Sequence, residues 1–103
     1  MYARLISFTG ADPSKRETAQ EMIRGTVIPT LREYEGFAGY LALFDPESTR
    51  ARAVILWDSK ESADAAEETL AERRVQMAAS VGLTVESVDL YEALVVELEG
   101  VHA

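Results

Sequence analysis

A chain of 103 residues is expected to form one domain, because a single hydrophobic core is adequate but not generous at this size. Hydrophobic residues make up 48% of the sequence, charged residues make up 27%, and the formal net charge is −8 at pH 7. This acidic balance argues against nucleic acid or an anionic membrane as partner, since both attract basic patches. The absence of cysteine excludes disulfides, thiol nucleophiles and thiolate metal sites.

The N-terminal residues carry no targeting pattern. Residues 1–6 lack a basic region followed by a long apolar stretch, so neither a signal peptide nor a membrane span is predicted. The default expectation is therefore a cytoplasmic protein.

A strand and a helix are the first predicted elements. Residues 2–9 alternate between two sets of side chains and stop at Gly10, which predicts a short strand. Asp12 and Pro13 predict a helix start, because the Asp carboxylate can accept free N–H groups of the first turn and proline has no donor to leave unpaired there. A stripe of apolar residues follows at helical spacing: Ala19, Met22, Ile23, Val27 and Leu31.

Pro29 is expected to interrupt this helix. It has no N–H for the Gly25 carbonyl and its ring crowds that turn, so a kink or a break is predicted near Thr26. Gly36 then serves as a left-handed terminator.

A hairpin follows, made of predicted strands over residues 37–44 and 50–57. The connecting sequence Asp-Pro-Glu-Ser-Thr, residues 45–49, supplies the turn chemistry. After Gly82 the last strand is predicted over residues 85–98, and residues 100–103 are expected to be a frayed tail.

The second helix lies between the hairpin and the last strand. Asp58 or Ser59 is expected to cap it, with Glu61 placed to close a capping box from Asp58, and Gly82 ends it. The predicted inward stripe is Ala63, Ala66, Leu70, Met77, Ala78 and Val81. The predicted solvated flank is Glu61, Asp64, Glu67, Glu68 and Glu72.

This order of elements predicts an α+β domain over residues 1–103 with the ferredoxin-like arrangement β-α-β-β-α-β. Two right-handed crossovers would place both helices on one face of an antiparallel four-stranded sheet. The predicted strands are apolar on both faces, so one apolar face of about 400 Å² is left uncovered. We therefore expect a homodimer through the sheet face that buries about 1,600 Å² in total. Which strand positions face the helices stays open, because a bulge at Gly39 or in the last strand would exchange the two faces.

Three stretches resemble the dimeric α/β-barrel superfamily and, within it, the antibiotic biosynthesis monooxygenase-like (ABM) group. They are residues 29–40 (PTLREYEGFAGY), the hairpin, and residues 55–63 (ILWDSKESA). The resemblance implies two ferredoxin-like sheets paired into a barrel, with substrate held between sheet and helices. It also implies activities such as cofactor-free oxidation of quinol- or anthrone-like aromatics, haem degradation or lactone isomerisation.

Four residues are candidates for lining a ligand pocket. Trp57 resembles the tryptophan that haem-degrading and some polyketide-oxidising relatives place beside the substrate; the alternative is a core aromatic. Tyr40 could donate a phenolic hydrogen bond, because Gly39 beside it leaves room for a ligand or a bulge. Met22 and Met77 lie on the inward stripes, where methionine is either adaptable lining or ordinary core.

Other chemistries find little support. Haem-degrading relatives need an asparagine and an axial histidine, whereas this chain has no asparagine and its only histidine is His102. The acidic residues follow a solvated helix face without the clustering of a metal site, so neither a metal nor a cofactor is predicted. No catalytic residue is nominated, because the Ser and Thr residues lack a histidine partner in the body of the domain. Arg4 and Arg52 are expected to pair with Asp89 or Glu92 across the sheet or the subunit boundary, or to bind a substrate carboxylate.

Two functions from different classes remain. The first is a cofactor-free monooxygenase-like enzyme acting on a small aromatic, quinol or polyketide-like substrate in an apolar pocket. The second is a non-catalytic homodimer that binds a small apolar ligand or serves a structural role. An enclosed, reachable cavity of about 300 Å³ or more would favour the enzyme.

Overall fold

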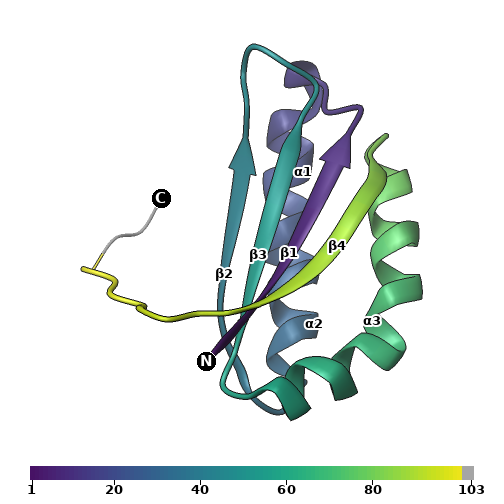
Figure 1. Ribbon diagram of the computed structural model, residues 1–103. Coiled ribbons are helices and arrows are strands. Elements are labelled where there is room, and N and C mark those ends of the chain that lie inside the picture. Colours follow the sequence, from purple (N-terminus) through teal and green to yellow (C-terminus); the bar gives the residue numbers. More distant parts are fainter. Residues whose placement is uncertain (101–103) are drawn as a thin grey trace.

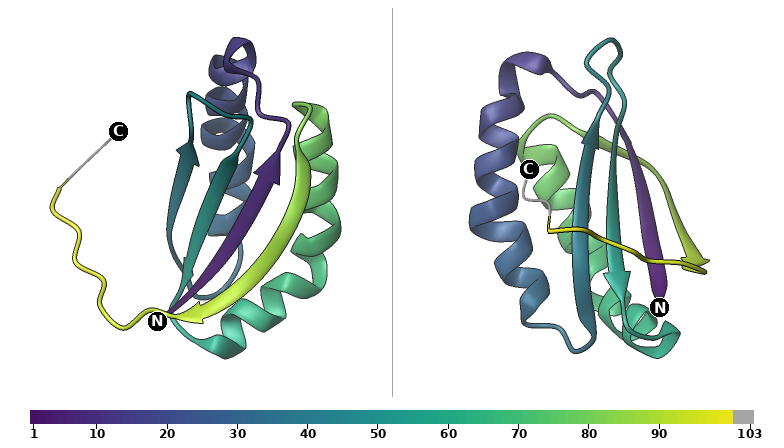
Figure 2. Two further views of the ribbon diagram at one scale, coloured as in Figure 1. Left: turned by 45° about the horizontal axis from the view of Figure 1, so that its top comes forward. Right: turned by 90° about the vertical axis from the view of Figure 1, so that its left-hand side faces the viewer.

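Four antiparallel strands form one sheet in the computed structural model, which describes residues 1–100 (Figure 1). The strands are β1 (Tyr2–Thr9), β2 (Phe37–Phe44), β3 (Ala51–Trp57) and β4 (Thr84–Glu92), arranged in the order β2-β3-β1-β4. The helical segments are η1 (Pro13–Lys15), α1 (Arg16–Met22), η2 (Ile23–Val27), α2 (Ile28–Arg32) and α3 (Lys60–Ser80). All of them lie on one face of the sheet and leave the other uncovered (Figure 2). The predicted ferredoxin-like arrangement is confirmed.

The first helical column is continuous, although a proline lies within it. Asp12 caps its start as predicted, since its carboxylate accepts from the Ser14 N–H at 2.9 Å. The kink or break expected near Thr26 is instead the π-helical segment η2, in which the Ile28 N–H donates to the Ile23 carbonyl five residues back. Pro29 lies in the first turn of α2, so the wider π turn absorbs the loss of its N–H and the helix continues.

Ser59, rather than Asp58, caps α3. The Ser59 hydroxyl accepts from the Ser62 N–H at 3.1 Å, whereas the Asp58 N–H donates to the Gly36 carbonyl. The predicted capping box between Asp58 and Glu61 is therefore not formed, and that prediction is wrong. Gly36 and Gly82 both have the left-handed backbone expected of terminators, with φ of +86° and +78°.

Two bulges decide which side chains face the helices. One shifts the β2–β3 register between Phe37 and Gly39, and the other shifts the β1–β4 register between Ser7 and Phe8. The Cβ that Gly39 lacks would lie 3.3 Å from Leu56, so the space beside Gly39 belongs to a neighbouring strand. The core that results under the helices consists of Ile6, Leu31, Ala53, Ile55, Trp57, Ala63, Ala66 and Leu70.

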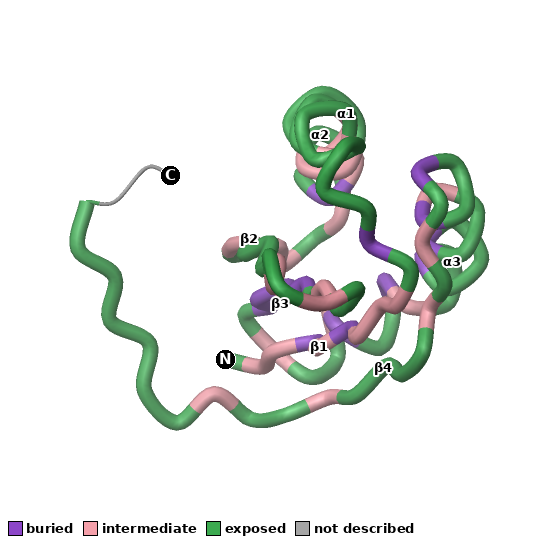
Figure 3. Tube along the Cα trace, turned by 90° about the horizontal axis from the view of Figure 1, so that it is seen from above, coloured by how far each residue is buried: buried purple, intermediate pink, exposed green. Residues whose placement is uncertain are grey.

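The opposite face of the sheet, called here the open face, is apolar and carries no helix. Leu5 and Leu41 both pair with Val54 in register, so all three side chains share this face. Leu41 and Leu43 are 46% and 50% exposed, and Tyr91 is also exposed. Figure 3 shows buried residues gathered where the sheet meets the helices.

The last strand is shorter than predicted. β4 ends at Glu92 instead of reaching Leu98, because its only neighbour, β1, begins at Tyr2. A final backbone bond joins the Ala93 N–H to the Met1 carbonyl at 2.9 Å. Residues 93–100, called here the C-terminal arm, then leave the sheet and run out past its β2 edge (Figures 1 and 3). Beyond Gly100, the expected tail lies outside the described residues.

Within residues 1–100, no helix combines the length and apolar character needed to cross a membrane.

Candidate functional site

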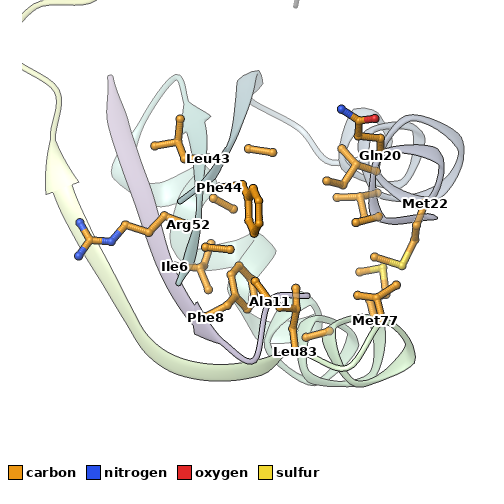
Figure 4. Close-up of a pocket in the computed structure, with 18 of the residues that line it drawn as sticks. Ile6, Phe8, Ala11, Gln20, Met22, Leu43, Phe44, Arg52, Met77 and Leu83 are labelled. Atoms are coloured by element: carbon orange, nitrogen blue, oxygen red, sulfur yellow. The ribbon is translucent and has the colours of Figure 1, made fainter. Parts of the chain in front are cut away.

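A cavity of about 310 Å³ lies between the sheet and the helices (Figure 4). Side chains from β1, β2 and β3 form one wall, and side chains from α1, η2 and α3 form the other. The lining is mainly apolar and includes Ile6, Phe8, Met22, Tyr40, Phe44, Ile55, Leu70, Arg74 and Met77. The Arg16 guanidinium lies 5.8 Å from the centre of the Phe44 ring, which links α1 to the end of β2 beside the cavity.

Three of the four predicted pocket residues line this cavity. Tyr40 does so from β2, whereas Met22 and Met77 approach it from the two helices and lie next to each other in Figure 4. Trp57 does not line it. Its side chain is only 1% exposed, and its ring makes edge-on contacts with Tyr34 and Phe37 at centroid distances of 6.4 and 6.0 Å. In this fold Trp57 therefore fills the core where β3 meets α3.

The sequence analysis missed a charged residue in the cavity wall. Arg74 is 8% exposed and lies within the apolar stripe of α3, between Leu70 and Met77. Both of its terminal nitrogens donate to the Glu67 carboxylate, at 2.7 and 2.8 Å. This two-pronged contact fixes the guanidinium plane. The seven-residue spacing of Glu67 and Arg74, which places both on one helix face, is the signal that could have revealed the pair.

A second buried arginine shares the same carboxylate. The Arg4 Nε lies 3.7 Å from Glu67 Oε1, and its terminal nitrogen donates to the Ala63 carbonyl at 3.3 Å. The same terminal nitrogen lies 3.7 Å from Asp64. The expected pairing of Arg4 with Asp89 is wrong, because Asp89 is in register with Leu5 and so belongs to the open face.

Two of the acidic residues assigned to the solvated flank of α3 have structural contacts. Glu67 is partly buried between Arg4 and Arg74, and Asp64 bonds to Lys60 at 2.8 Å. Arg52, in contrast, is exposed on the open face and makes no ion pair with any residue from 1 to 100. Figure 4 shows its side chain directed away from the cavity.

Two pKa values in the cavity wall and its ion-pair cluster are shifted in opposite directions, that of Glu67 by the arginine charges and that of Tyr40 by burial. Burial alone would raise the pKa of Glu67, but the hydrogen bonds and charge of Arg74, together with the charge of Arg4, lower it below its ordinary value. Burial raises the pKa of Tyr40 to about 12, although the positive charge of Arg74 acts in the other direction. At neutral pH the cavity therefore presents a guanidinium and a neutral phenol within apolar walls.

This arrangement suits a ligand with an aromatic body and an acidic oxygen. The apolar walls can hold a flat ring system, while Arg74 can stabilise a negatively charged oxygen and Tyr40 can donate a hydrogen bond to it. Among residues 1–100, no three potential metal ligands come together.

No protein-family model matches the sequence, and no curated protein matches it either. Solved structures do match the fold. The cofactor-independent oxygenase SnoaB from Streptomyces nogalater superposes with a TM-score of 0.66 over 95% of this chain and 97% of its own, at 15% identity. The fold is that of the antibiotic biosynthesis monooxygenases.

Two further solved structures share this monooxygenase fold. The Streptomyces coelicolor monooxygenase from the gene ActVA-Orf6, solved with the ligand nanaomycin D, has a TM-score of 0.67 and 17% identity, covering 96% of this chain and 92% of its own. HapK from Hahella chejuensis has a TM-score of 0.71 and 13% identity, covering 97% and 99%. At these identities the comparisons establish the fold.

Proposed function

We propose that this protein is a cofactor-free monooxygenase-like enzyme that oxidises a small aromatic, quinol or polyketide-like substrate. The observation that carries the proposal is the apolar cavity of about 310 Å³ with the buried Arg74 in its wall. Its volume lies at the lower end of the range of about 300–1,000 Å³ that is typical of small-molecule pockets. Support also comes from the likeness in fold to a cofactor-independent oxygenase and to a monooxygenase solved with nanaomycin D.

In this reaction the substrate itself supplies the electrons. An anthrone-like substrate loses a proton to give an enolate, whose carbon reacts with O₂; one oxygen atom stays as a new carbonyl and the other leaves as water. Arg74 would stabilise the enolate oxygen, and Tyr40, a neutral phenol, would donate a hydrogen bond to it. The apolar walls would orient the ring and exclude water.

Oxygen consumption by the purified protein tests the proposal. With a panel of quinol and anthrone-type substrates, uptake should exceed the uncatalysed rate, and Arg74→Lys should lower it more than Tyr40→Phe because a lysine cannot reproduce the planar fork on Glu67. Leu41→Ala on the open face, away from the cavity lining, is the matched control and should leave the rate per subunit unchanged. Uptake at the uncatalysed rate across the panel would refute the enzyme.

A non-catalytic ligand-binding protein is the second candidate. Asp12 is the one carboxylate among the described residues that line the cavity, and it already accepts from the N–H and the hydroxyl of Ser14. This contact lowers the pKa of Asp12, which makes it a weak base. Saturable binding of a quinone product without oxygen uptake would favour this candidate.

We further propose that the open face packs against a second copy of the chain. Leu41, Leu43 and Tyr91 are exposed on it and adjoin Leu5 and Val54. Two such faces would together bury an area within the range of stable interfaces, about 1,200–2,000 Å². Sedimentation at micromolar concentration should give a particle of twice the 11.3 kDa chain mass, and a stable, well-folded monomer would refute this contact.

A further inference from the structure

Two of the three methionines of this chain lie together in the cavity wall. Met22 comes from the end of α1 and Met77 from α3, and their side chains lie next to each other (Figure 4). Both are half-buried, whereas Met1, the third methionine, is 45% exposed at the start of the chain. A methionine that only filled the core would be enclosed by other side chains, but these two border a cavity of about 310 Å³. A molecule inside the cavity can therefore reach their thioethers.

Ser80 is the polar neighbour of this pair of sulfurs. Its Oγ lies 3.4 Å from Met22 Sδ and 2.6 Å from the Met77 carbonyl oxygen. The hydroxyl has one hydrogen, and the nearer carbonyl is the stronger acceptor, so the lone pairs of the Met22 sulfur stay available. A thioether with available lone pairs reacts with peroxides to give a sulfoxide. The Ser80 hydroxyl is also close enough to donate to the oxygen atom that such a reaction would add to Met22.

A cationic group accompanies the two thioethers. Arg74 precedes Met77 by three residues on α3, and side chains at this spacing are neighbours on one helix face. Its guanidinium is buried in the same cavity wall and is held there by Glu67. A fixed positive charge in an apolar wall can stabilise the alkoxide that departs when a peroxide O–O bond breaks. The cavity wall thus contains a nucleophile for a peroxide and a group that stabilises its leaving anion.

We propose that Met22 and Met77 form an oxidation site for aromatic hydroperoxides bound in the cavity. The sulfur attacks the outer oxygen of R–O–OH, so that the O–O bond breaks and an S–O bond forms. The sulfur is oxidised to the sulfoxide, the hydroperoxide is reduced to the alcohol R–OH, and the proton of the outer oxygen passes to the departing alkoxide. The sulfoxide places a polar group in an apolar wall, which disfavours further binding of apolar ligands. The site requires only that the cavity bind an aromatic ligand, which both candidate functions share, and does not depend on oxygen uptake.

The order in which the three methionines are oxidised tests the site in the unmodified chain. Cumene hydroperoxide should oxidise Met22 or Met77 at least about tenfold faster than Met1, because binding holds its aromatic body in the cavity and its peroxide beside the sulfurs. Hydrogen peroxide lacks the aromatic body and is the matched control, which should oxidise the exposed Met1 first. Peptide mass spectrometry measures both orders. Preferential oxidation of Met1 by cumene hydroperoxide, or the same preference for the pair with both reagents, would overturn the proposal.

A double variant, Met22→Leu with Met77→Leu, gives a second readout. Leucine conserves most of the side-chain volume, so circular dichroism should show a folded protein. With excess cumene hydroperoxide the unmodified chain should release about two more equivalents of 2-phenyl-2-propanol per subunit than the variant, because each sulfur reduces one hydroperoxide. Equal release from the two proteins would show that the pair is not the site of reduction.

Oxygen uptake separates this site from the proposed enzyme. A protein that shows no uptake with quinol and anthrone-type substrates, yet has Met22 or Met77 oxidised first by cumene hydroperoxide, retains the oxidation site and loses the proposed reaction. A protein that takes up oxygen, yet has Met1 oxidised first by cumene hydroperoxide, retains the reaction and loses the oxidation site.

Discussion

The two faces of the sheet have similar apolar sequences but different environments. On the helix face, Ile55 and Trp57 are almost fully buried against α2 and α3. On the open face, Leu41 and Leu43 remain about half exposed. Alternation along a strand therefore identifies two faces, whereas the number of helices decides how many of them one subunit can cover. Substitutions on the two faces should accordingly change different properties.

The largest effect is expected at the centre of the helix face. Trp57→Ala removes a buried ring that contacts Tyr34 and Phe37, so the free energy of unfolding should fall by about 3–5 kcal/mol. Urea denaturation of the folded subunit measures this loss. A change below about 1 kcal/mol would mean that the ring is not a core residue. Because of this role, loss of oxygen uptake in Trp57→Ala would not by itself indicate contact with substrate.

The next effect concerns the two arginines that share Glu67. Glu67→Gln leaves Arg4 and Arg74 without their common negative charge, which should lower the free energy of unfolding by about 3 kcal/mol. The lowered pKa of Glu67 implies stability that is present above pH 4.5 and lost as pH falls through the folded-state pKa. Denaturation between pH 3 and 7 should show this dependence in the unmodified protein and a weaker one in Glu67→Gln. Parallel curves would contradict the shared ion pair.

A smaller effect should appear at alkaline pH. The pKa of Tyr40 is raised from 10.0 to about 12, so its neutral form is favoured in the folded protein. The corresponding stability is fully present below pH 10 and is lost as pH rises toward 12, by at most about 2–3 kcal/mol. Comparing the unfolding of the unmodified protein with Tyr40→Phe across this window isolates the contribution. The variant should lose less stability; equal losses would place the Tyr40 hydroxyl in water.

The smallest effect on the subunit is expected on the open face. Leu43→Ala should change the free energy of unfolding of the dilute subunit by less than about 0.5 kcal/mol, because half of the side chain is already exposed. The same substitution should weaken self-association, which sedimentation equilibrium measures. A large loss of subunit stability without any change in association would reverse the assignment of the two faces.

Much of this fold was predictable from local patterns. The strands β1 and β2, the hairpin, the cap at Asp12 and the terminators Gly36 and Gly82 depend on alternation, turn chemistry and backbone conformation, all of which are written in neighbouring residues. The end of β4 was not predictable in this way. Residues 93–98 have strand composition, but a strand needs a neighbour, and β1 begins at Tyr2.

The candidate site was only partly predictable for a similar reason. Met22 and Met77 were found because the inward stripes of the two helices converge on the sheet. Tyr40 was found through the room expected beside Gly39, which the Leu56 side chain occupies. Arg74 was missed because a charged residue in an apolar stripe was not matched with Glu67 two turns earlier. Trp57 had two interpretations, a residue beside the ligand by resemblance and a core aromatic, and its contacts support the core aromatic.

Side-chain spacing along the chain was enough to predict the order of elements, the ferredoxin-like arrangement and the surplus of apolar strand surface. The folded chain was needed to assign the strand face that borders the cavity, because the bulges beside Gly39 and Ser7 set that parity through pairing between distant segments. The fold reveals more than this parity. It also decided that Arg4 and Arg74 share Glu67, because a buried charge requires a partner and β1 meets α3 only in the folded chain.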